Sequence, residues 1–208
     1  MKTQCIRCGL VAGLAVTAMG MGACPSTMTT TGGAGTTGMG GGTTAPGATM
    51  TAAELKLAMD ALAAMNAHRA TKSLAPLTWY AAGAQVAYTH DLAMEAGGFF
   101  AHVDPNTNTD PATRAKNAGI THDPLGSIDP TSGNPFVGEN LFNTTDPNVT
   151  GQDAVNSWIA SPGHHTQIDA PLPVAGAQTM PPWTHCGIGV RKGNGQSWWT
   201  AMFFRNPN

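Results

Sequence analysis

Charged side chains are scarce in this sequence. Asp, Glu, Lys and Arg make up 11% of the 208 residues and leave a formal net charge of −2, whereas an average soluble protein has about 25% charged residues. No stretch interleaves Lys and Arg with aromatic residues, so the positive surface that phosphate binding requires is missing. The composition therefore excludes nucleic acid as a partner.

Cysteines are also few, and most of them lie near the N-terminus. The chain has four, at positions 5, 8, 24 and 186. Only Cys186 falls in the part that is predicted to fold, so we expect no disulfide there and predict that Cys186 is a small buried apolar residue. A G-x-S-x-G motif is missing as well, and Cys186 lies within a strand pattern, which argues against covalent hydrolase mechanisms.

The long apolar run of the chain is confined to its first residues. Lys2 and Arg7 precede an apolar, small-residue stretch at 9–23, which is typical of a secretory signal and too short for a membrane span. The stretch ends in the letters MGAC, which resemble the bacterial lipoprotein cleavage box. We expect removal of residues 1–23, lipidation of Cys24 and attachment to a membrane; an ordinary signal cleaved nearby is the alternative. Both predict an exported protein, either lipid-anchored in the cell envelope or secreted.

A Thr/Gly-rich segment separates this signal from the rest of the chain. Residues 24–50 carry no charge and no hydrophobic period. Such a composition cannot bury enough apolar surface to offset the entropy of ordering, so it predicts a disordered tether. Residues 51–208 are then predicted to form one domain of ordinary size.

Helix signals dominate the first part of this domain and strand signals its last part. Helix-end residues and apolar residues at helical spacing predict four helices. The first two span about 51–69 and 81–97. The third has Asp110 as N-cap, Pro111 as its first residue and Gly119 just past its end. The fourth starts at Thr150 and is broken by Pro162.

Alternation predicts a hairpin of strands 186–190 and 197–204 around a turn at 192–195. Trp198 and Trp199 should then point to opposite faces, one into the core and one towards a surface. The pattern favours an α+β fold with helices packed on a small antiparallel sheet.

Two histidines and a glutamate at the ends of predicted elements are candidate site residues. His102, Glu139 and His164 form a ligand set suited to a divalent metal, Zn²⁺ or Mg²⁺. Their separations fit no local metal motif, and each histidine alone also agrees with a surface or capping role. Glu139 has two interpretations, a metal-related role or hydrogen bonds that fix nearby loops. Asn140 is predicted to bond backbone groups in the same cleft.

Six motifs occur together and in the order of a known family: MNAHRA, LAPLTWYAAGAQVAYTHDLA, FFAHVDP, VGENLF, AVNSWIASPGHHTQI and HCGIGV. They resemble the CAP superfamily, whose domain is also called the SCP domain, and the SPGH segment is typical of its bacterial branch. The resemblance implies a three-layer α-β-α sandwich with a cleft that holds His102, Glu139 and His164. Animal and plant members usually carry a further glutamate shortly after the position of Trp158. This chain lacks it, so at most a triad is implied, with His165 as a substitute ligand.

Two functions of different classes agree with these observations. The first is an exported, membrane-tethered binding module for a small apolar ligand or a cell-envelope partner, with a weak divalent-metal site in the cleft. The resemblance supports it, because family members bind sterols and lipids and act outside cells. The alternative is a peptidase-like metal-dependent hydrolase, with His102 and His164 holding the ion and Glu139 as general base. Two histidine ligands are fewer than catalytic zinc sites usually have, so the sequence favours the binding module.

Overall fold

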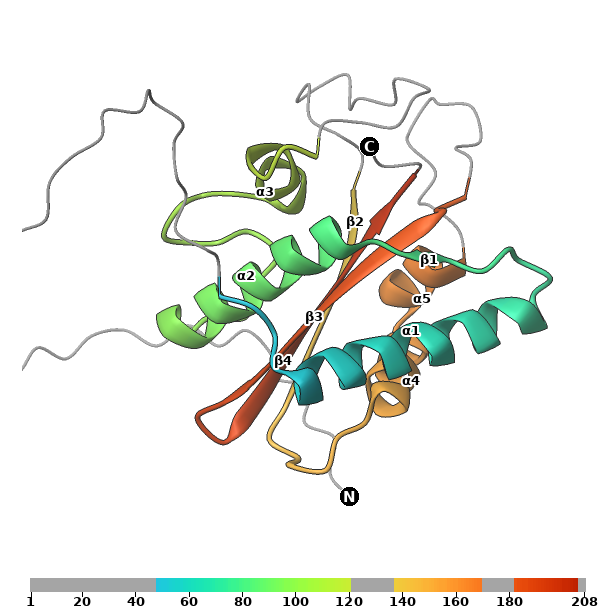
Figure 1. Cartoon of the computed structure of the whole chain (residues 1–208), viewed down its shortest axis with the longest axis horizontal. Helices are drawn as coiled ribbons and strands as arrows, with labels where there is room; N and C mark the ends of the chain where they lie inside the picture. Colours follow the sequence, from blue (N-terminus) through green and yellow to red (C-terminus); the bar gives the residue numbers. More distant parts are fainter. Residues whose placement is uncertain (1–47, 121–136, 170–181, 206–208) are drawn as a thin grey trace, which may run out of the picture. The chain divides into compact units, whose positions relative to one another are not determined.

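A four-stranded sheet forms the centre of the domain in the computed structural model, which describes residues 48–120, 137–169 and 182–205 (Figure 1). The strands lie in the order β1-β3-β4-β2, with the bounds β1 Thr78–Trp79, β2 Gly138–Thr144, β3 His185–Gly193 and β4 Gln196–Phe204. Strands β2, β4 and β3 are antiparallel neighbours, whereas the short β1 runs parallel to β3. The α+β fold is confirmed, and β1 makes the sheet mixed rather than purely antiparallel.

The hairpin of β3 and β4 is confirmed, with a tighter turn than predicted. Asn194 and Gly195 connect the two strands with φ angles of 50° and 72°. Positive φ at both central residues is the requirement of the two-residue turn that matches strand twist, and Asn-Gly is its preferred sequence. The register of the hairpin is therefore set locally.

Five helices occur in the described residues: α1 Ala52–Thr71, α2 Ala81–Gly97, α3 Pro111–Asn117, α4 Gly151–Ala160 and α5 Pro162–Asp169. Thr51 and Glu54 form a reciprocal capping box at α1, and Thr150 and Asp153 form another at α4. Each box satisfies amide groups that the first turn of a helix leaves without partners. The predicted starts of these helices are confirmed.

Two elements, α5 and β2, differ from the sequence-based expectation. Pro162 does end α4, but it is also the first residue of α5, a position where the missing amide hydrogen costs nothing. Strand β2 contains the GEN segment that was expected only at the end of an element. It pairs with β4 along its whole length, from Gly138 opposite Phe203 to Thr144 opposite Ser197.

Helices cover both faces of the sheet, which gives three layers (Figure 1). Trp199, Ala201 and Phe203 of β4 pack in one core cluster with residues of α1 and α4, whereas Met202 and Phe204 pack in another with residues of α2 and α3. This alternation is the two-residue period of a strand buried on both faces. Trp198 and Trp199 do point to opposite faces, but the expectation of a surface position for one is wrong, since both are buried.

Candidate functional site

His102 lies in the loop between α2 and α3, and Arg114 of α3 fixes this loop. The loop is closed by a β-bridge between Asp104 and Thr109. Arg114 Nη1 donates to the carbonyl oxygens of His102 and Thr109, at 2.8 and 2.9 Å. These bonds present the His102 ring to β2, where Nδ1 lies 2.9 Å from Glu139 Oε1.

Glu139 lies on β2 and is nearly inaccessible, with 2% of its side chain exposed. A buried carboxylate is costly unless charged or hydrogen-bonding groups compensate for the lost water. Here Arg114 Nη2 donates to Oε2 at 2.5 Å, and the His102 ring contacts Oε1. Both oxygens of Glu139 are therefore engaged by side chains of the loop and of α3.

His164 lies in the first turn of α5, and its ring faces that of His102 with 6.4 Å between the centroids. The buried Asn140 of β2 donates from Nδ2 to the carbonyl oxygen of His164 at 2.9 Å, which ties α5 to the sheet. Burial lowers the pKa of His164, and the neighbouring His102 lowers it further. A lowered pKa favours the neutral form of the His164 ring at neutral pH.

The four predicted cleft residues come together from three separate segments. His102 comes from the loop, Glu139 and Asn140 from β2, and His164 from α5. Asn140 bonds a backbone group, as its sequence context predicts. A metal-binding or catalytic role for the other three stays a prediction.

The cleft does not place three ligand atoms around one point. Among residues 48–120, 137–169 and 182–205, a single group of three has ligand atoms within 4.8 Å of one another, and it lies elsewhere: His68, His165 and Asp169. In the cleft, the guanidinium of Arg114 forms an ion pair with Oε2 of Glu139. A positive charge there repels a metal cation.

Comparison with known proteins decides the family. The profile of the CAP family, described as the cysteine-rich secretory protein family, matches residues 62–203, which is more than half of the chain. The chain belongs to the CAP family. The match includes His102, Glu139 and His164. No curated protein sequence matches the chain.

Solved structures similar to this CAP domain include two bacterial proteins. An extracellular protein of Bacillus anthracis that contains an SCP domain has 20% identity and a TM-score of 0.55, over 76% of this chain and 45% of its own. An outer surface protein of Borrelia burgdorferi has 15% identity and a TM-score of 0.51, over 70% of this chain and 89% of its own. The chain thus spans less than half of the Bacillus anthracis protein. At these identities the likeness confirms the three-layer fold alone.

Arg114 contacts both His102 and Glu139 in the cleft, but no sequence motif pointed to it. The helix α3 around it was predicted from Asp110 and Pro111, but one arginine in a short helix belongs to no motif. The available signal was indirect. A glutamate inside a strand segment needs a cationic partner if it is buried, and α3 directly follows the loop that carries His102.

A pocket of about 380 Å³ opens beside the cleft. Its lining includes residues of α2 and α3, among them Val86, Thr89, His90, Ala93 and Arg114. His90 is buried, and its Nδ1 has no hydrogen-bond partner among the described residues. Burial lowers the pKa of His90, and the charge of Arg114 lowers it further. The His90 ring and the small aliphatic side chains of Val86, Ala93 and Ala118 line the pocket together with polar residues, and Arg114 links the pocket to the cleft.

Cys186 is confirmed as a buried apolar position. It is free, it lies in the core cluster beneath α1, and burial raises the pKa of its thiol. A thiol that stays protonated at neutral pH is a poor nucleophile. This agrees with the expectation that Cys186 does no covalent chemistry.

The predicted signal at 1–23, lipidated Cys24 and nearly all of the linker at 24–50 lie outside the described residues, which begin at residue 48. Within the described part, no helix combines the length and the apolar character that a membrane crossing needs. The domain boundaries and the lipid anchor stay predictions.

Proposed function

We propose that this CAP-family protein is an exported, membrane-tethered binding module for a small apolar molecule. The observation that carries the proposal is the pocket between α2 and α3. Pockets for small molecules usually measure about 300–1,000 Å³ and combine apolar walls with a few polar groups. The pocket of about 380 Å³ falls in that range. Val86, Ala93 and Ala118 supply apolar side chains, and polar groups come from lining residues that include Thr89, His90 and Asp104.

The contacts among His102, Glu139 and Arg114 in the cleft support binding rather than catalysis. A hydrolase of the predicted kind needs Glu139 as a base, or an ion that activates water. In this structure Arg114 and His102 engage both oxygens of Glu139. The same contacts hold the loop and α3 in place, and α3 forms part of the pocket. The metal-dependent hydrolase is therefore not favoured.

Filling the pocket is expected to abolish binding of an apolar probe. Ala93→Trp places a large ring where Ala93 lines the pocket, so affinity for the neutral dye N-phenyl-1-naphthylamine should fall by about tenfold or more, about 1.4 kcal/mol. Fluorescence titration of the purified protein measures it. Ala96→Trp is the matched control, because Ala96 is an exposed residue of the same helix. Equal affinity in both variants, or no dye binding by the parent protein, would contradict the proposal.

The membrane tether rests on the N-terminal pattern and on the kind of proteins that share the fold. Structures described as an extracellular protein and as an outer surface protein are similar to this domain, and the MGAC letters precede a Thr/Gly-rich segment. A lipid chain with a long tether would display the pocket at a distance from the membrane.

Replacing Cys24 is expected to release the protein from membranes. In a bacterial expression host the parent protein should partition into the detergent phase of Triton X-114, since acyl chains bind apolar phases in proportion to their length. Cys24→Ser should move it to the aqueous phase. Cys8→Ser, inside the predicted signal, should change nothing. A parent protein found in the aqueous phase would exclude the anchor.

A further inference from the structure

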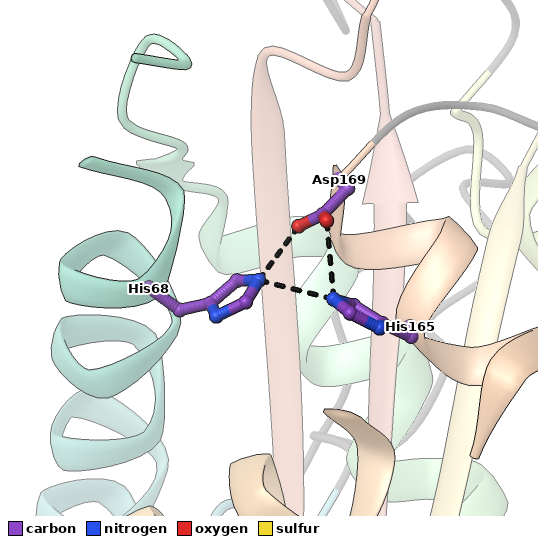
Figure 2. A group of neighbouring side chains, drawn as sticks. All are labelled: His68, His165 and Asp169. Atoms are coloured by element: carbon purple, nitrogen blue, oxygen red, sulfur yellow. Dashed lines mark hydrogen bonds and ion pairs between the residues drawn. The ribbon is translucent and has the colours of Figure 1, made fainter. Parts of the chain in front are cut away.

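Two histidines and an aspartate meet where α1 packs against α5, and none of the three is one of the four predicted cleft residues. His68 lies in the last turn of α1, while His165 and Asp169 lie one turn apart on α5. Figure 2 shows the three side chains converging from the two helices. Nothing in the sequence singled out this group. The sequence patterns assigned no site role to His68, which lies in the MNAHRA motif, and suggested His165 only as a substitute ligand for the cleft.

The three contacts between these side chains are all short. His68 Nε2 lies 2.8 Å from Asp169 Oδ1, and His165 Nε2 lies 3.1 Å from Asp169 Oδ2. The two Nε2 atoms are 3.3 Å apart. Exposed fractions of 16%, 33% and 27% for the side chains of His68, His165 and Asp169 leave the group reachable by solvent.

Hydrogen bonds cannot account for all three contacts at once when Asp169 is ionised, wherever the hydrogens of the two imidazole rings are placed. If both Nε2 atoms carry hydrogen, each donates to Asp169 and the two N–H groups oppose each other. If only one carries hydrogen, the lone pair of the other faces a carboxylate oxygen. A cation at the centre resolves the conflict, because both imidazoles and the carboxylate then direct lone pairs at it.

The spacing also fits the coordination geometry of zinc. With Zn–N bonds of about 2.0–2.1 Å, neighbouring ligands of a tetrahedral ion lie about 3.3–3.4 Å apart. The distance between His68 Nε2 and His165 Nε2 is 3.3 Å. The two contacts to Asp169, 2.8 and 3.1 Å, are shorter than this edge and end on different oxygens, so the carboxylate has to move outward to bind the same ion.

We propose that His68, His165 and Asp169 form a divalent transition-metal site that accepts Zn²⁺, with a fourth ligand from solvent. Imidazole ligands favour Zn²⁺ over Mg²⁺, which prefers oxygen. The ion would cross-link the C-terminal turn of α1 to α5. Because His164 lies on α5, the same ion would hold one wall of the cleft in place. The site is independent of the proposed ligand-binding function.

The buried Arg69 interacts electrostatically with Asp169 of this site. Burial lowers the pKa of Arg69, and the negative charge of Asp169 partly offsets that effect. Arg69 Nε donates to the carbonyl oxygen of Ala75, and Nη1 donates to that of Ile168, the residue before Asp169. Removing the charge of Asp169 would therefore also change the electrostatic surroundings of Arg69. For this reason a variant at His68, which leaves that charge in place, is the cleaner test.

Zinc binding by the purified, chelator-treated protein tests the proposal. We expect one Zn²⁺ per chain by calorimetry, and a higher melting temperature with Zn²⁺, since a ligand at 100 times its Kd stabilises by about 2.7 kcal/mol. His68→Ala should weaken zinc binding by at least about tenfold. His102→Ala and His164→Ala are the matched controls in the cleft and should keep it. Co²⁺ in place of Zn²⁺ should give the intense visible absorption of a four-coordinate ion.

The melting temperature in chelator shows whether each variant is folded. If His68→Ala is unstable, His68→Gln keeps the length of a polar side chain without an imidazole and should show the same loss of zinc affinity. Zinc affinity that disappears in His102→Ala but persists in both His68 variants would overturn the proposal. So would a parent protein that Zn²⁺ does not stabilise.

Discussion

Replacing Gly189 by alanine is expected to lower the free energy of unfolding by about 3 kcal/mol or more. Gly189 lies on β3 beneath α2, and an added methyl group would overlap the backbone of Ala87 and Tyr88 and the carboxyl group of Asp91. A helix backbone cannot rotate aside as a side chain can, so α2 must shift off the sheet. Urea unfolding measures the loss. A melting temperature lower by about 6–12 °C should accompany it.

Gly163→Ala is the matched control for this substitution. Gly163 is the second residue of α5, and an added methyl group there meets no atom within 4 Å. Alanine is favoured over glycine within a helix by about 0.5–1 kcal/mol, so stability should stay the same or rise slightly. Equal losses in the two variants, or an unchanged Gly189→Ala, would show that α2 does not need the glycine.

The strand around Gly189 shows what a local pattern can predict. Alternation in HCGIGV predicts a strand, and Cys186, Ile188 and Val190 do pack in the core on the α1 side. The reason for the glycines between them, Gly187 and Gly189, cannot be found in the local pattern. They face the backbone of α2, which is about a hundred residues earlier in the chain.

Helix caps and the hairpin turn were predictable because short-range chemistry determines them. Thr51, Asp110 and Thr150 each bond an amide three residues ahead, and Asn194-Gly195 supplies the positive φ angles of its turn. Strand β2 was not predictable in this way. Glu139 and Asn140 put polar groups at buried positions, and their partners come from α3, the His102 loop and α5. A local sequence pattern cannot predict such a strand, because the hydrogen-bonding partners of its buried polar groups come from distant parts of the chain.

The adjacent residues His164 and His165 also show that a local pattern predicts only part of the candidate site. Successive residues of a helix point about 100° apart, so divergence of the two rings could be expected. His164 does face the cleft and His165 faces His68. The contact of His165 with His68 could not be predicted from the sequence, since it depends on the packing of α5 against α1. The family resemblance gave site roles to His102, Glu139 and His164. It gave none to Asp169, and none to His68, although the MNAHRA motif contains His68.

Removing the charge of Arg114 is expected to destabilise the domain by about 3–5 kcal/mol, the usual cost of leaving one partner of a buried ion pair alone. Arg114→Met keeps much of the aliphatic length but leaves Glu139, 2% exposed, with only the His102 ring. It also removes the bonds to the carbonyl oxygens of His102 and Thr109. Urea unfolding near neutral pH measures the change.

A second substitution separates the two contributions of Arg114. Glu139→Gln removes the buried charge, so Arg114→Met combined with Glu139→Gln should recover a large part of the loss, with a coupling energy of about 2 kcal/mol or more. What is not recovered reports the bonds from Arg114 to the loop. If the two single losses simply add, the ion pair contributes little, and Arg114 acts on the cleft through the backbone of the His102 loop instead.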